Sequence, residues 1–368
     1  MAKGKNNFVK DYGQLMKDLE NKVYYPVYLL HGDESFYIDE VTSFIENNVL
    51  EEDFRAFNQT VVYGRDVTAR EVADLCRRFS MMGNYQVVIV KEAQDLTANN
   101  RKLDELEPYF DNPQEDTILV LAFKHKNIDK RKSFYKKIKE LQKDKKAVIL
   151  ETQKLYDNQV PAWIDTYVQN KGFSIDPKST RLLADHVGND LSRLVNEINK
   201  LFISGHDTKK ITPELIETNI GISKDFNIFE LTNALGRRDI VKALQIVNYF
   251  EANPKENPLQ MITVMLYNYF VKVFLYHRFK KEGNDYQIAS AMGVSPFFVK
   301  DYAVAANSYS PQVIRKIISE IRYLDLKSKG YGAVDAKDYG PLSEFVFKCV
   351  HRVFTDHEEP ERLSTISG

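Results

Sequence analysis

The sequence lacks several features that would assign it to a familiar class of protein. Among its 368 residues there are only two cysteines, Cys76 and Cys349, and both lie within apolar helical patterns. Two such isolated thiols give neither a disulfide framework nor metal-ligand spacing, so we expect both to be reduced packing residues. The formal net charge is −1, which gives the chain as a whole no attraction for nucleic acid or anionic lipid. Any affinity of that kind must come from local patches.

Signals for export or membrane insertion are also scarce. The first ten residues are basic and polar, without the apolar stretch of a secretory signal. Residues 259–279 are strongly apolar, but they include Lys272 near their middle, and a lysine at that depth of a bilayer costs about 2.5–3.5 kcal/mol. We therefore expect a buried helix of an all-α domain, no membrane partner and a cytoplasmic protein.

Common catalytic motifs are absent as well. The chain has no G-x-S-x-G, no H-E-x-x-H and no paired carboxylates around a glycine-rich loop. No catalytic residue, metal site or cofactor is predicted, and the search for function turns from catalysis to binding.

What the chain does contain is a change of pattern near residue 150. Before it, short apolar strands alternate with helical patterns, which predicts an α/β domain with a covered parallel sheet at residues 1–150. After Glu151 the strand patterns stop and helices bounded by glycine and proline follow. We predict a small helical lid domain at 151–222, an all-α domain at 223–354 and a flexible tail at 355–368.

The first strand runs into a loop that begins like a nucleotide-binding P-loop and then departs from it. A working loop reads G-x-x-x-x-G-K-[ST]. Counted from Gly32, the second glycine is Tyr37, the lysine is Ile38 and the Ser/Thr is Asp39. The loop therefore has a bulky ring, no cation, and a carboxylate where an anion should bind. This combination predicts a degenerate site that holds no nucleotide. The alternative is that the chain was never related to P-loop proteins.

A second P-loop element departs from the pattern too. The strand at Val87–Val90 ends in Lys91 and Glu92 instead of the metal-binding Asp-Glu pair.

Large apolar residues follow the next predicted helix, at 69–78, where a polar turn would be ordinary. They are Phe79, Met81 and Met82, and such flexible, polarisable side chains suit an adaptable protein contact. Periodicity alone favours burial of the two methionines under the sheet.

Basic residues dominate positions 124–146, with eleven Lys and Arg against three acidic residues. A solvated helix face is the favoured interpretation. Contact with phosphates is the alternative, with Lys130, Arg131, Lys136 and Lys137 as candidates. A further segment, Ile288–Val299, resembles a helix–turn–helix, but it lacks the residues that read base edges, so a packing turn is favoured.

Taken together, these segments resemble the delta subunit family of the bacterial DNA polymerase III clamp loader, from about Tyr25 to Phe354. Each piece is weak alone, but their order and spacing are specific. The matching segments are Pro26–Glu34, Phe79–Met82 before Gln86–Ala93, Asp129–Arg131, Gly188–Leu191 leading to Asn196–Leu201, and Met292–Lys300.

The resemblance implies a degenerate AAA+-type P-loop α/β domain, a helical lid and an all-α collar. It also implies a subunit without ATPase activity, within a nucleotidyltransferase complex, that binds and opens the ring-shaped beta sliding clamp. The family's clamp contact falls on Met81 and Met82. Many members have an aromatic at the second place, where this chain has Met82 with Phe79 nearby.

The partners implied are the clamp, the gamma/tau motor subunits, the delta-prime subunit and primer–template DNA. Two other interpretations stay open from the residues themselves. One is an active AAA-type ATPase or helicase, and the other is a DNA-binding regulator that uses the turn at 288–299.

Overall fold

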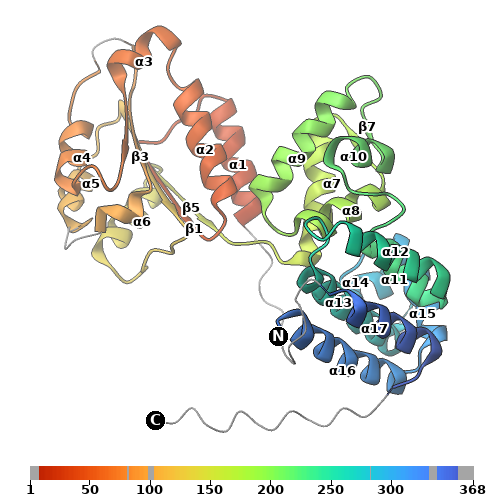
Figure 1. The fold of residues 1–368 in the computed structure, drawn as a ribbon. Coiled ribbons are helices and arrows are strands. Elements are labelled where there is room, and N and C mark those ends of the chain that lie inside the picture. The colour runs from red at the N-terminus through yellow and green to blue at the C-terminus, as the bar shows by residue number, and fades with distance from the viewer. Residues whose placement is uncertain (1–7, 81–82, 98–102, 282, 331–337, 355–368) are drawn as a thin grey trace, which may run out of the picture. The chain divides into compact units, whose positions relative to one another are not determined.

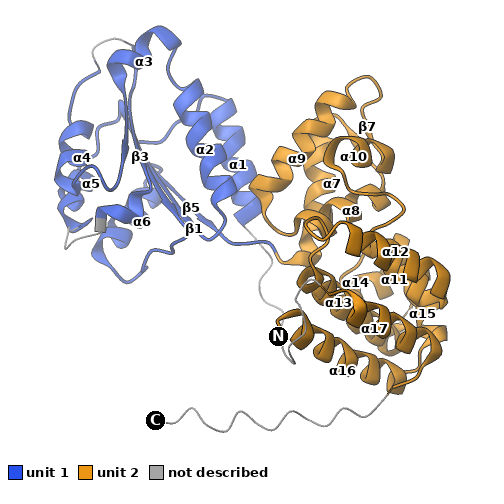
Figure 2. Cartoon of the chain, viewed as in Figure 1, with its two compact units in different colours: residues 1–155 blue, residues 156–368 orange. Residues whose placement is uncertain are grey.

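The computed structural model describes residues 8–80, 83–97, 103–281, 283–330 and 338–354. The chain divides into two compact units, residues 1–155 and 156–368 (Figure 2). This division lies close to the change of pattern near residue 150. The second unit holds both the expected lid and the expected all-α domain, so their separation near residue 222 stays a prediction.

The first unit is an α/β domain around one parallel sheet (Figure 1). The strand order is β2-β3-β4-β1-β5, and every neighbouring pair is parallel. Its elements are α1 (Phe8–Glu20), β1 (Val27–Gly32), α2 (Ser35–Asn48), α3 (Glu52–Asn58), β2 (Gln59–Tyr63), α4 (Ala69–Cys76), β3 (Gln86–Lys91), η1 (Ala93–Thr97), η2 (Leu103–Leu106), α5 (Glu107–Phe110), β4 (Thr117–Lys124), α6 (Ser133–Lys143) and β5 (Ala147–Thr152).

Both faces of this sheet are covered, which explains why its strands read as continuous apolar runs. Along β1, Tyr28 and Leu30 pack into one core with residues of α1 and α2. Val27 and Leu29 point the other way, into a second core built by α4, α5 and α6. Every residue of β1 is buried, so the strand that leads into Gly32 is fixed from both sides.

Several elements of this unit were not predicted, among them the short α5, η1 and η2. Helix α1 begins within the first ten residues, which we described only as basic and polar, and its apolar residues pack beneath the sheet. Helix α3 and strand β2 were missed too. Strand β2 is at the edge of the sheet and partly exposed, so it lacks the continuous apolar run of the central strands.

The second unit is mainly helical. Its elements are η3 (Asp157–Gln159), α7 (Val160–Asn170), β6 (Ser174–Ile175), α8 (Pro177–Val187), α9 (Leu191–Ser204), β7 (Lys210–Ile211), α10 (Pro213–Ile220), α11 (Ile228–Arg237), α12 (Ile240–Ala252), α13 (Leu259–Phe279), α14 (Asp285–Met292), η4 (Pro296–Phe298), α15 (Val299–Ser308), α16 (Pro311–Ser328) and α17 (Gly340–His351).

The expectation that strands stop after Glu151 is wrong in one detail. Strands β6 and β7 form a two-residue parallel pair, which is too short to leave a periodic signal in the sequence.

Helix α13 is the apolar segment that raised the question of a membrane span. It is long and apolar enough to cross a bilayer by length and composition. In this fold it packs against α15 and α16, and Leu266, Phe270 and Val273 are fully buried in the core of the second unit. The expected buried core helix is confirmed.

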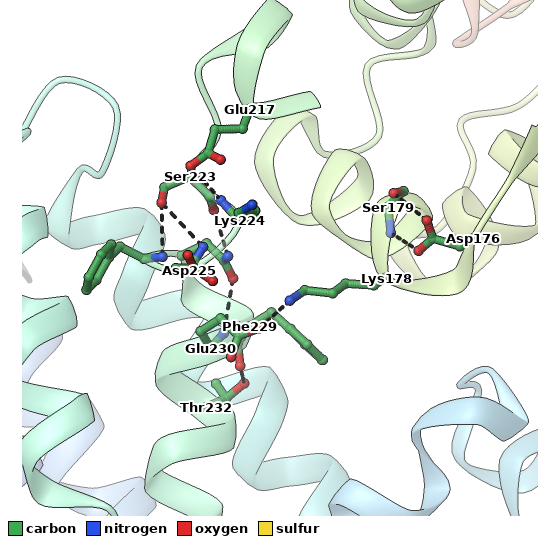
Figure 3. A network of polar contacts seen from close by, with 12 residues as sticks. Asp176, Lys178, Ser179, Glu217, Ser223, Lys224, Asp225, Phe229, Glu230 and Thr232 are labelled. Carbon is green, nitrogen blue, oxygen red and sulfur yellow. Dashed lines mark hydrogen bonds and ion pairs between the residues drawn. The ribbon is translucent and has the colours of Figure 1, made fainter. Parts of the chain in front are cut away.

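Helix α8 joins the helices on either side of residue 222. Asp176, the N-cap of this helix, accepts a hydrogen bond from the N–H of Ser179 over 2.9 Å. In the first turn, Lys178 forms an ion pair with Glu230 of α11 at 2.7 Å (Figure 3). Arg181 lies between the rings of Phe229 and Phe298, 4.6 and 4.8 Å from their centroids. These contacts lock α8 onto α11 and η4 across the sequence boundary.

Candidate functional site

The loop after β1 is closed against the end of β5. Gly32 has a φ of +137°, and a Cβ placed on it would lie 2.0 Å from the carbonyl oxygen of Thr152. The N–H of Asp33 donates to the same carbonyl over 3.2 Å. In a phosphate-binding loop, backbone N–H groups of this kind point at the ligand. Here one of them is already satisfied by the neighbouring strand.

The N-terminus of α2 carries its own anion. The buried carboxylate of Glu34 accepts a hydrogen bond from the N–H of Phe36 over 3.2 Å. Negative charge is favoured at a helix N-terminus, which is also where a P-loop holds phosphate. The sequence argument placed the obstructing carboxylate at Asp39, whereas the side chain at the helix N-terminus is that of Glu34.

Tyr37 and Ile38, which replace the glycine and lysine of a working loop, are buried. The ring of Tyr37 packs edge-on against Phe8 and Tyr12 of α1, with centroids 5.3 and 4.6 Å away. Ile38 lies in the core beneath α2. The missed helix α1 therefore explains the tyrosine, because its aromatic residues form the pocket that receives the ring.

Asp39 belongs to an internal ion-pair network at the carboxyl ends of the strands. Its carboxylate is 2.7 Å from Nζ of Lys124, which also lies 3.4 Å from Glu92. Burial lowers the pKa of Lys124, but the two carboxylates more than offset this, so its pKa is raised overall. Lys91, the predicted cation at the end of β3, pairs with Glu46 of α2 at 2.7 Å.

These contacts define what the edge of the sheet can do chemically. The charges of Asp39, Glu92 and Lys124 are neutralised within the protein. In the described part of the chain, no group of three Asp, Glu, His or Cys residues could hold a metal ion. The geometry is that of a structural junction between strands and helix.

A different surface lies at the end of α4. Met81 and Met82 fall outside the described residues, but the residues beside them are described. The side chain of Phe79 is 80% exposed. Buried Asn58 of α3 donates to Oγ of Ser80 over 2.9 Å, and Ser80 donates to the carbonyl of Gly83 over 3.2 Å. Ser80 is thus bonded to α3 before the two methionines, and Gly83 after them is bonded to Ser80.

Five of the eleven basic residues in the run at 124–146 are paired with carboxylates of the same chain. Lys130 pairs with Glu151 and Lys137 with Asp111, each at 2.6 Å. Arg131 binds Asp129 through both carboxylate oxygens, and these hydrogen bonds lower the pKa of that carboxyl to about 2. Among the four predicted DNA contacts, the exposed Lys136 is the one without an ion pair in the described structure. The sequence could not separate Lys130 and Lys137 from Lys136, since the carboxylates of Glu151 and Asp111 come from distant segments.

The turn at 288–299 is confirmed as a packing turn. Ile288, Met292 and Phe298 are buried in the core of the second unit, and the ring of Phe298 lies over the Arg181 guanidinium. These residues of the turn therefore face the protein interior, whereas Phe297 is exposed.

The first unit thus has the architecture of an AAA+-type domain whose nucleotide loop is filled by its own side chains. Two family models match the chain: "DNA polymerase III, delta subunit" over residues 28–153, and the C-terminal domain of the same subunit over residues 225–336. Together they span more than half of the sequence. The chain belongs to the family of DNA polymerase III delta subunits.

Comparisons with individual relatives point to the same family. The chain is 28% identical over 321 residues to DNA polymerase III subunit delta of Bacillus subtilis, an alignment that covers 85% of this chain and 90% of the relative. It is similar in structure to the DNA clamp loader delta protein of Bacillus subtilis, with a TM-score of 0.51 and 25% identity, over 93% of this chain and 100% of the other. The predicted fold class and family are confirmed, and the chain is a non-catalytic subunit of a polymerase complex.

Proposed function

We propose that this subunit binds the ring-shaped sliding clamp and holds one of its interfaces open, without hydrolysing ATP itself. The closed loop after β1 supports the proposal that the subunit does not hydrolyse ATP. The Asp33 N–H is bonded to the Thr152 carbonyl, Glu34 caps α2, and Lys124 is held by two carboxylates. A nucleotide would have to displace all three sets of contacts.

The clamp-binding element is the segment around Met81 and Met82, together with Phe79. The family resemblance puts the contact at the two methionines, and the exposed Phe79 ring next to them supports an apolar anchor. Hot spots in protein interfaces are side chains of this kind that enter a pocket on the partner. The Asn58–Ser80–Gly83 hydrogen bonds fix both ends of the segment, which reduces the entropy lost on binding.

Opening requires that the subunit bind the open ring more tightly than the closed one, since a ligand with equal affinity for two states shifts neither. In this proposal ATP acts through the gamma/tau motor subunits, which expose or hide the clamp-binding element. The mainly helical second unit, with a lid at 151–222 and a collar at 223–354, joins those subunits and the delta-prime subunit. The complex carries the subunit to primer–template DNA in the cytoplasm.

The anchor is tested by the double substitution Met81→Ala and Met82→Ala, with clamp binding measured by surface plasmon resonance. If both side chains enter a pocket, affinity falls at least about 30-fold, which corresponds to about 2 kcal/mol. Phe79→Ala shows whether the ring shares the anchor. The matched control is Ile203→Ala in the second unit, because its side chain is also 80% exposed. Unchanged affinity of the folded double variant would contradict the assignment.

The closed loop is tested separately by isothermal titration of the isolated chain with ATP and Mg²⁺. We expect no binding up to millimolar nucleotide. Micromolar affinity would favour the active ATPase or helicase alternative. The helix–turn–helix regulator is the less favoured alternative, because Ile288, Met292 and Phe298 of that turn pack into the core of the second unit.

A further inference from the structure

The basic run of the first unit separates into two classes of cation. Five of its members, Lys124, Lys130, Arg131, Lys137 and Lys146, pair with carboxylates of the same chain. Five others are exposed and have no ion pair in the described structure: Lys145, which follows α6, and four that lie on α6 or at its N-cap. These four, which we call the α6 stripe, are Lys132, Lys136, Lys139 and Lys143.

The spacing of the α6 stripe places its members on one line. Lys132 is the N-cap of α6 and the other three follow at intervals of four, three and four residues. At 3.6 residues per turn these positions fall within an arc of about 60° and extend over about 16 Å. Glu140 is an acidic residue within the same helix, and it lies on the flank of this arc, about 40° from its nearest member, Lys136.

No ion pair in the described part of the chain offsets the mutual repulsion of these lysines, and Glu140 is the single carboxylate that shares their side of α6. Like charges three and four residues apart on a helix repel each other and cost stability. Carboxylates do lie on the neighbouring α5, but they are used elsewhere: Asp111 pairs with Lys137, and Glu107 accepts a hydrogen bond from Ser133. The stripe is therefore a row of positive charge that an external polyanion can neutralise.

The opposite face of α6 indicates which polyanion fits. Phe134, Ile138 and Leu141 are buried in the core against the sheet, so the helix has no apolar face to insert into a lipid surface, as an interfacial helix requires. A rigid straight row of point charges suits a rigid row of phosphates. Over about 16 Å a DNA duplex presents about ten phosphates.

We propose that the α6 stripe binds the phosphate backbone of duplex DNA, independently of base sequence. The proposal moves the expected DNA contact from Lys130, Arg131 and Lys137 to a row that includes Lys136 and three lysines not singled out from the sequence. It does not depend on the clamp contact, which involves a different segment, the one that follows α4.

The test compares two full-length variants that lose the same charge. The stripe variant carries Gln at the four lysines. The control variant carries Gln at Lys10, Lys17, Lys22 and Arg70, which are also exposed in the first unit and have no ion pair in the described structure. Binding of a fluorescent duplex of about 20 base pairs is followed by anisotropy between about 50 and 200 mM salt.

We expect micromolar binding by the wild type at low salt and retention of that binding by the control. The stripe variant should bind the duplex at least about 100-fold more weakly at about 50 mM salt. In a plot of log Kd against the logarithm of the salt concentration, its slope should be smaller by about 0.9 for each lysine that contacts a phosphate. Its thermal midpoint should not fall, because the removed charges repel one another.

Three results would overturn the proposal: no duplex binding by the wild type at low salt, equal losses in the two variants, or an unchanged salt slope in the stripe variant. Anionic lipid vesicles and polyglutamate serve as competing probes. Stripe-dependent binding of either, in place of the duplex, would assign the surface to a membrane or an acidic protein and would refute the choice of DNA.

Discussion

The closure of the loop after β1 can be tested by giving Gly32 a side chain. In Gly32→Ala the new methyl group would lie 2.0 Å from the Thr152 carbonyl oxygen and 2.6 Å from its Oγ1. An L-residue at positive φ costs about 1–2 kcal/mol, and the displaced carbonyl loses the Asp33 hydrogen bond, worth about 0.5–1.5 kcal/mol. With the added displacement of the end of β5, we expect the free energy of unfolding to fall by about 3–4 kcal/mol.

Gly83→Ala is the matched control, because Gly83 also has a positive φ, +86°, but its Cβ would lie 3.6 Å from the nearest atom, in Phe54. That variant should lose only the strain, about 1–2 kcal/mol. Both are measured by urea denaturation with far-UV circular dichroism. The only tryptophan of the chain, Trp163, is in the second unit and reports on it separately. If Gly32→Ala costs no more than Gly83→Ala, the loop is not closed as described.

Three further predictions concern the second unit, the end of β1 and the nucleotide site. Arg181→Met removes two ring contacts and leaves Asp185 without its partner, so the transition followed by tryptophan fluorescence should lose about 2–3 kcal/mol. Burial lowers the pKa of His31, so this side chain takes up a proton at a higher pH in the unfolded state than in the folded state. The free energy of unfolding therefore falls as the pH drops below about 6.5. His31→Gln should flatten that fall in denaturation curves between about pH 5 and 7. The triple change Tyr37→Gly, Ile38→Lys and Asp39→Thr restores the P-loop residues but should not give ATP binding by calorimetry, since Glu34 and the Thr152 contact remain.

Local patterns were enough to predict the central strands and the longest helices. The range 259–279 agrees with α13 because a strong apolar pattern and a proline boundary coincide there. The edge strand β2 was missed because partial exposure weakens its pattern. The α1 helix was missed because the first ten residues were judged by charge, whereas Phe8 is already buried in the fold.

The candidate sites depend more strongly on contacts between distant segments. The loop residues identified the site as degenerate, but the partners that fill it come from elsewhere: Thr152 from β5, Lys124 from β4 and Phe8 from α1. The basic run gave a similar problem, since Lys137 and Lys136 are neighbours and only the first meets a carboxylate, that of Asp111 on α5. Such pairings carry no signal within a single sequence window.

The closure also shows why loss of the motif residues is only part of the loss of a nucleotide site. Three substitutions in a loop can be reversed, whereas the charge network ties the same edge of the sheet to several elements. Lys124 on β4 is the shared partner of Asp39 on α2 and Glu92 after β3, so removing the lysine leaves two partly buried carboxylates without it. The lysine therefore constrains both carboxylates. A site closed in this way supports the sheet that carries the proposed clamp-binding element, and reopening it would weaken that support.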